Sequence, residues 1–196
     1  MTKTSIANRA VKAKPSATPS RIQNNIRSSK AIVDQKIVAN DFIHLAETEG
    51  LGLDDLPSGQ VSVTLSFWLE HKSAIKQRGH QVAVQVGADE DPASLVNDLA
   101  EIDVIVLPFV AHVDGRGYSH AHKLRERFGF TKEIRAIGDV KFDQLRFLSR
   151  VGCSAFELPE SENLESALLA FKELQEVYQP AADGAPLIFS RRRRVH

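Results

Sequence analysis

The chain of 196 residues contains a single cysteine, Cys153, so it can form no disulfide bond within itself. One thiol is also too few for a zinc knuckle or for an iron–sulfur cluster held by the protein's own cysteines. No stretch approaches the ~20 apolar residues that a membrane-spanning helix needs, so we expect no membrane association. This cysteine usage, without an apolar signal segment, predicts a cytoplasmic protein.

Acidic side chains are missing from the first 33 residues, which hold seven lysines and arginines, and residues 191–194 are four arginines. Residues 34–190 hold 25 acidic and 14 basic side chains. We therefore predict a disordered basic tail at 1–30, one acidic α/β domain at 31–180, and a C-terminal tail at 181–196 that ends in the arginine run. An acid-free, serine- and arginine-rich N-terminus is also typical of transit peptides. Nucleic-acid binding is not expected, because the body shows no basic face interleaved with aromatic residues.

Apolar runs that begin near residues 82, 104, 133 and 155 predict strands separated by helical patterns. Such spacing is typical of βαβ units, so we expect an α/β fold with a small, mostly parallel sheet of about four or five strands. A β-hairpin is expected within residues 31–45, as a lid or an edge. The sheet is either open or half of a (β/α)₈ barrel, and eight strands are not expected to fit in this length.

A glycine-bearing loop follows the strand near residue 104 and reads Asp-Gly-Arg-Gly-Tyr-Ser over residues 114–119. Glycines let the backbone approach a ligand closely, and a helix start with Arg116 favours an anion. We therefore treat six residues as a candidate anion-binding loop: Asp114, Gly115, Arg116, Gly117, Tyr118 and Ser119. The alternative is a tight turn in which Asp114 and Ser119 cap the following helix.

The next strand carries Arg135 and ends in Gly138-Asp139. A charged arginine within a covered strand needs a partner, and Asp114, Asp139 and Glu157 are the candidates. Either this is a structural ion pair, or Arg135, Gly138 and Asp139 join the Asp114–Ser119 loop in one pocket. In the second case Asp139 and Asp114 are the candidate catalytic acids or bases.

No cofactor fingerprint is evident, because the chain has neither a phosphate-binding loop of the GxGxxG type nor a G-x-S-x-G nucleophile motif. His112, His120 and His122 suggest a metal cluster at first sight. The last two lie about 200° apart around a helix, so they cannot share a ligand face, and we predict no metal site. Cys153 is expected to be a small buried apolar residue.

Five segments of the sequence resemble the bacterial family called domain of unknown function 934. They are residues 114–119, 124–129, 133–140, 143–145 and 152–156, and the resemblance extends over roughly residues 31–194. It marks the following motif positions without giving them roles: Asp114, Gly115, Arg116, Gly117, Tyr118, Ser119, Arg125, Arg135, Gly138, Asp139, Asp143 and Gln144. The family usually has a cysteine where this chain has Val151, and here the thiol is Cys153, which argues against a shared thiol mechanism.

Members of that family are described as oxidoreductases with a role in sulfite reduction and are encoded beside sulfite reductase. The resemblance therefore implies an accessory or redox-associated protein of assimilatory sulfite reduction, which supports the sulfite reductase hemoprotein by electron delivery or assembly. The alternative is an enzyme or sensor that binds a small oxyanion such as sulfite at the Asp114–Ser119 loop. A third hypothesis is nucleic-acid or regulatory binding through the basic tails.

Overall fold

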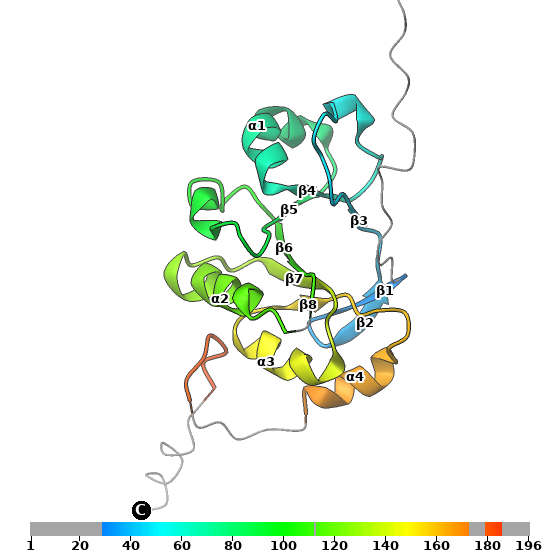
Figure 1. Cartoon of the computed structure of the whole chain (residues 1–196), viewed down its shortest axis with the longest axis vertical. Helices are drawn as coiled ribbons and strands as arrows, with labels where there is room; N and C mark the ends of the chain where they lie inside the picture. The colour runs from blue at the N-terminus through cyan, green and yellow to red at the C-terminus, as the bar shows by residue number, and fades with distance from the viewer. Residues whose placement is uncertain (1–28, 112, 173–178, 186–196) are drawn as a thin grey trace, which may run out of the picture.

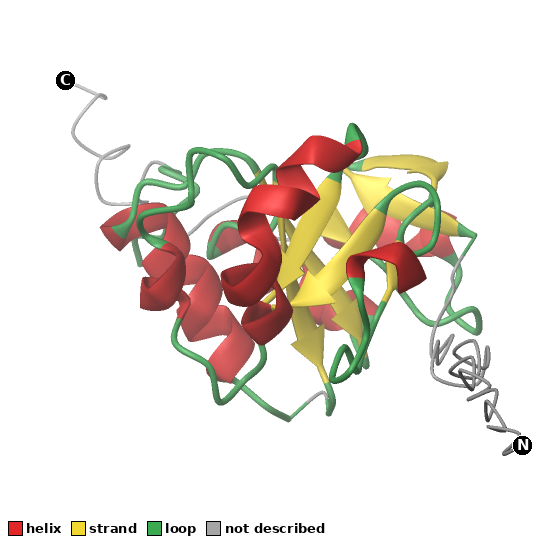
Figure 2. Ribbon diagram, turned by 90° about the horizontal axis from the view of Figure 1, so that it is seen from above, coloured by secondary structure: helices red, strands yellow, loops and turns green. Residues whose placement is uncertain are grey.

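A computed structural model describes residues 29–111, 113–172 and 179–185, and it shows one sheet of eight strands surrounded by short helices (Figures 1 and 2). The strand order is β2-β1-β8-β7-β6-β5-β4-β3. The strands are β1 (Lys30–Val33), β2 (Lys36–Ala39), β3 (Ile43–His44), β4 (Val61–Thr64), β5 (Val82–Gln85), β6 (Val104–Phe109), β7 (Glu133–Gly138) and β8 (Ala155–Phe156). The α-helices are α1 (Leu65–Ile75), α2 (Arg116–His122), α3 (Leu145–Arg150) and α4 (Leu164–Ala170).

Shorter helical segments complete the connections between strands. Four are 3₁₀-helices, at Leu53–Asp55, Lys76–Arg78, Pro92–Leu95 and Phe142–Gln144, and Lys123–Arg127 forms a π-helix. Asp91 caps the third 3₁₀-helix by accepting a hydrogen bond from the backbone of Ala93, as its position before a proline predicts. In the part of the chain that the structure describes, no helix is both long and apolar enough to cross a bilayer. Most of the predicted tails, 1–28 and 186–196, lies outside the described residues.

The sheet corrects our prediction of four or five mostly parallel strands. Six strands from β3 to β8 are parallel and neighbours in chain order, as in half of a (β/α)₈ barrel, and the β1–β2 hairpin adds two antiparallel strands. Eight strands fit because β3 and β8 have only two residues each and the connecting helices are short. The predicted hairpin exists, with positive φ at Asp34 and Gln35 in its turn, and it pairs with β8 as part of the same sheet.

The sheet curls into a half-barrel, which a contact between distant strands demonstrates. Four strands separate β3 from β8, so in a flat sheet the two would lie ~24 Å apart, at about 4.8 Å per strand. Instead His44 on β3 lies 2.9 Å from Glu157, the residue after β8. Figure 1 shows the bend, with α1, α2, α3 and α4 on its outer side.

Alternate residues of the central strands belong to two different cores, as the two-residue period of a strand requires. One set joins the large core under the helices and includes Val84, Ile105 and Ile134. The other set faces the inside of the half-barrel, where Ala83, Val104, Val106 and Ile137 surround Phe42. Phe42 lies on the segment between β2 and β3, so this short segment fills the interior that the curled sheet leaves.

Candidate functional site

The loops that follow β6 and β7 begin side by side at the carboxyl edge of the sheet. Phe109 and Gly138, the last residues of the two strands, are register partners, and the backbone N–H of Asp139 donates to the Phe109 carbonyl at 2.7 Å. The Asp114–Ser119 segment and Asp139 therefore both lie at this edge, where ligands of parallel sheets usually bind. This placement is the one that the sequence predicts.

Within the first loop, Asp114 and Arg116 form a charge pair. The Arg116 guanidinium donates to the Asp114 carboxylate at 2.7 and 2.9 Å, and it also contacts Asp89 from the loop after β5. The hydrogen bonds from Arg116 lower the pKa of Asp114 to about 2. Arg116 is therefore held between two carboxylates of its own chain. Asp114 also accepts a hydrogen bond from the Arg116 backbone N–H at 3.1 Å. Because α2 begins at Arg116, Ser119 lies inside the helix and does not cap it.

The two glycines of the predicted site that are buried have packing reasons to be glycine. A Cβ atom on Gly117 would lie 2.6 Å from the Phe109 ring, so α2 could not pack this closely on β6. Gly138 has φ of +97°, and its Cβ would lie 2.3 Å from the Phe109 carbonyl oxygen. Tyr118 completes this packing with ring centroids 5.6 Å from Phe109 and 5.3 Å from Phe147.

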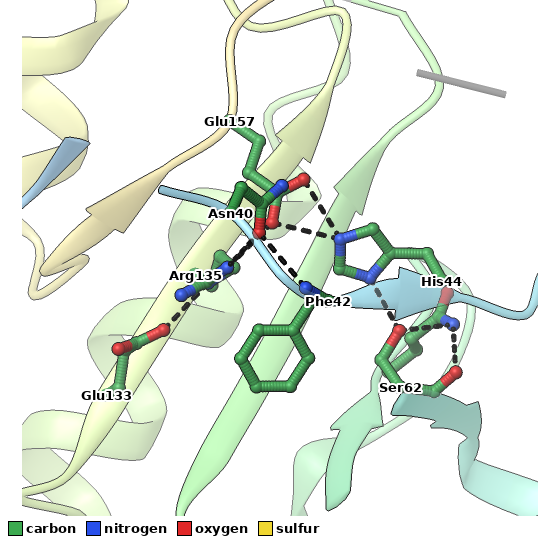
Figure 3. A network of polar contacts seen from close by, with 8 residues as sticks. Asn40, Phe42, His44, Ser62, Glu133, Arg135 and Glu157 are labelled. Carbon is green, nitrogen blue, oxygen red and sulfur yellow. Dashed lines mark hydrogen bonds and ion pairs between the residues drawn. The ribbon is translucent and has the colours of Figure 1, made fainter. Parts of the chain in front are cut away.

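Arg135 takes part in a separate group of contacts, inside the half-barrel (Figure 3). Its guanidinium donates to Glu157 at 2.8 Å, to Glu133 at 2.7 Å and to the Asn40 side chain at 3.0 Å. It also lies 4.5 Å from the centroid of the Phe42 ring, a cation–π contact. Of the three partners that the sequence suggested, only Glu157 pairs with Arg135, and Asp139 pairs with Lys141 at 3.3 Å.

His44 extends this network across the interior. Its Nε2 lies 2.9 Å from Glu157 and its Nδ1 lies 2.6 Å from Ser62 Oγ, while Gln85 Nε2 donates to the same serine oxygen at 2.9 Å. One arrangement of protons fits all of these bonds: Ser62 donates to Nδ1, and Nε2–H donates to the carboxylate that Arg135 also holds. Six different strands or strand ends thus contribute side chains to one network of hydrogen bonds, which we call the interior network: Asn40, His44, Ser62, Gln85, Glu133, Arg135 and Glu157.

Burial and charge compete at Glu157. Burial raises the pKa of this carboxyl group, but the hydrogen bonds donated by His44 and Arg135, together with the positive charge of Arg135, outweigh burial and hold the pKa below its usual value. Glu157 is therefore ionised at neutral pH although its side chain is fully buried. Ser62 is fully buried as well, so its hydroxyl has no contact with solvent despite its histidine partner. The interior network therefore connects the two sides of the half-barrel through hydrogen bonds.

The remaining reactive residue types do not converge on either group of contacts. Cys153 is buried, and burial raises the pKa of its thiol to about 12. His120 is buried with its Nδ1 unpartnered, and burial lowers its pKa. His122 is exposed, His112 lies outside the described residues, and among the described residues no three His, Cys, Asp or Glu side chains are grouped to hold a metal.

These observations define a half-barrel α/β protein whose interior is crossed by a hydrogen-bond network and whose loops at the carboxyl edge of the sheet carry paired charges. The chain belongs to the family of bacterial proteins of unknown function DUF934, which it matches over residues 83–189. This range runs from β5 past α4 and includes every residue of the predicted site, and it is shorter than the 31–194 over which we noted the resemblance. Searches of the curated proteins and of the solved structures found no match.

Proposed function

We propose that this protein is an accessory protein of assimilatory sulfite reduction that binds the sulfite reductase hemoprotein and supports its assembly or its supply of electrons. The role in sulfite reduction rests on the family resemblance. The preference for an accessory role over catalysis rests on one observation: the charged residues of the predicted site are already paired within the chain. Binding to the hemoprotein is the step that assembly and electron supply have in common.

The pairing is specific for each charged group. Arg116 contacts Asp114 and Asp89, while Arg135 contacts Glu133 and Glu157. A substrate anion at either arginine would have to displace a carboxylate, and for Arg135 it would also leave buried charges without partners. Such pairs stabilise the loops and the interior more readily than they carry out acid–base chemistry.

Deleting the gene tests this proposal in cells. The deletion strain should grow normally with cysteine as its sulfur source and poorly with sulfate, and its extracts should contain less active sulfite reductase. Adding back the wild-type gene should restore both. Equal growth of the deletion strain and its parent on sulfate would contradict the proposal.

The oxyanion-binding alternative stays a prediction, and a melting experiment separates it from the accessory role. A ligand at ~100 times its dissociation constant adds about 2.7 kcal/mol to the free energy of unfolding. Because Arg116 is engaged by two carboxylates, we expect sulfite to raise Tm no more than chloride does at equal ionic strength. A rise with sulfite that Arg116→Ala abolishes would favour the alternative.

A further inference from the structure

The loop after β6 exposes two large apolar side chains close together. Val110 is 87% exposed and Val113 is 79% exposed, well above the other exposed aliphatic residues of the described chain. Phe142, in the neighbouring loop after β7, and Phe147, on α3, are each about half exposed, at 51% and 54%. We call these four residues the apolar patch. Single exposed apolar residues are common, but a group of them on adjoining elements is typical of an interaction surface.

Specific contacts position residues next to the patch and one of its members, Phe147. The loop after β6 turns back through a hydrogen bond from the Asp114 N–H to the Ala111 carbonyl at 3.0 Å. Beneath it, Tyr118 lies between Phe109 and Phe147, so the ring of Phe147 is positioned by the same packing that holds α2 on β6. A surface that is held in place before binding loses less conformational entropy when a partner docks.

The loops at the same edge of the sheet as the patch are strongly acidic. All leave the carboxyl ends of parallel strands, so they gather at one edge of the sheet. In residues 45–49, 86–91, 110–116, 139–144 and 158–163 the only lysine or arginine side chains are Arg116 and Lys141. Both of these contact carboxylates. The acidic side chains in the same stretches are exposed or half-buried: Glu47, Glu49, Asp89, Glu90, Asp91, Asp114, Asp139, Asp143, Glu160 and Glu162.

We propose that the apolar patch and this acidic rim form a docking surface for a positively charged protein surface with apolar side chains at its centre. An apolar centre within a charged rim is the usual composition of a protein–protein interface. The excess of carboxylates selects a basic partner and speeds its approach. This inference rests on the proposed function and deepens it, because it assigns the surface that contacts the hemoprotein and the charge of the face that it meets.

Titration calorimetry of the full-length protein against purified sulfite reductase hemoprotein tests the assignment. The double variant Val110→Ser/Val113→Ser removes apolar surface from the patch at two highly exposed positions, so folding is expected to be unchanged, and circular dichroism verifies this. Val96→Ser is the matched control, because Val96 is also an exposed valine, 45% accessible, but follows the Pro92–Leu95 helix between β5 and β6. We expect the double variant to weaken Kd at least about tenfold, and the control to change it less than about twofold. Raising the salt concentration should weaken wild-type binding.

Each outcome decides the inference. If the hemoprotein binds the double variant as tightly as the wild type, the docking surface is wrong while the proposed function stands. If the wild type does not bind at all, both fall, because the inference takes its partner from the proposed function. If the wild type instead self-associates in sedimentation experiments and the double variant does not, the occupant of the patch is a second copy of this chain, and the basic partner is wrong.

Discussion

Removing the Glu157 carboxylate should destabilise the protein more than any change at an exposed acidic residue. Glu157 is fully buried and is the common partner of His44 and Arg135, one from each side of the half-barrel. In Glu157→Ala, Arg135 keeps Glu133, whose side chain is partly exposed, but loses its buried counter-charge. His44 loses the acceptor of its Nε2–H at the same time.

The size of the effect follows from the burial of the pair. Removing one partner of a buried, hydrogen-bonded ion pair costs about 3–5 kcal/mol, because the other charge remains in a medium that solvates it poorly. For a protein of this length each kcal/mol corresponds to roughly 2–4 °C in Tm, so we expect a fall of roughly 6–20 °C. Glu160→Ala changes an exposed carboxylate and should stay within about 0.5 kcal/mol.

Urea unfolding followed by the fluorescence of Trp68, the only tryptophan, measures this difference. The indole is buried and its N–H donates to Asp98 at 3.3 Å, so unfolding exposes it to water. The double-mutant cycle with His44→Ala should show a coupling free energy above about 1 kcal/mol, because the two side chains share a hydrogen bond. If Glu157→Ala lowers the free energy of unfolding by less than about 1 kcal/mol, the view that the interior network holds the two sides of the half-barrel together is refuted.

The same carboxyl group predicts how stability depends on pH. Since the pKa of Glu157 is lower in the folded than in the unfolded protein, its ionisation contributes stability that is fully present above the ordinary value of 4.5. That contribution is lost as pH falls through the lowered folded pKa. The stability difference between the wild type and Glu157→Gln should therefore be constant near neutral pH and shrink in acid. A difference that grows in acid would contradict the assigned direction.

Three further predictions test the carboxyl edge and the core. Gly138→Ala should lower the free energy of unfolding by at least about 3 kcal/mol, because φ is +97° and the new methyl group would meet a backbone oxygen at 2.3 Å. Gly115→Ala, with open space around its Cβ, should be nearly neutral, and equal unfolding midpoints for the two variants would refute this reasoning. The buried thiol of Cys153, with a pKa raised to about 12, should not react with Ellman's reagent at pH 8 until urea unfolds the chain, and rapid labelling of the native protein would show that it is accessible. NMR titration should give the Asp114 carboxyl a pKa of about 2, and this pKa should rise towards 3.8 in Arg116→Ala. A lowered pKa marks an interaction that is fully present above pH 3.8 and is lost as pH falls towards 2. An unchanged pKa in the variant would contradict the pairing.

The strands that the sequence predicts at the right positions are those rich in apolar residues. β5, β6, β7 and β8 begin at residues 82, 104, 133 and 155, where the apolar runs predict them. β3 and β8 both have two residues, but Ala155, Phe156 and Leu158 mark β8 as an apolar segment, whereas β3 pairs one apolar residue with His44. β3 pairs with β4 as a parallel partner, which its own sequence does not indicate. The predicted strand count was therefore wrong, because β3 was missed and the hairpin joins the same sheet, while the half-barrel is one of the two forms that the sequence left open.

The interior network shows a different limit of sequence reasoning. Arg135 within an apolar strand signals a buried charge, and Glu157 was among its predicted partners. Nothing near His44 or Ser62 in the sequence indicates that they join the same network, because their meeting depends on the curvature of the whole sheet. A histidine within a two-residue strand becomes informative only after the strand order is known.

Several residues that carry the family resemblance have packing or hydrogen-bonding roles at the two edges of the sheet. Gly117 and Gly138 allow close packing around Phe109 at the carboxyl edge. At the amino edge, Arg125 in the π-helix donates to the carbonyls of Phe130 and Lys132, before β7, and of Gly152, before β8.

Asp114 and Arg116 brace the loop after β6 against the loop after β5. None of these roles needs a reacting substrate, and the side chains that the loop after β6 exposes most are Val110 and Val113. Exposed apolar side chains beside charges that are already paired within the chain support the proposed role in binding another protein.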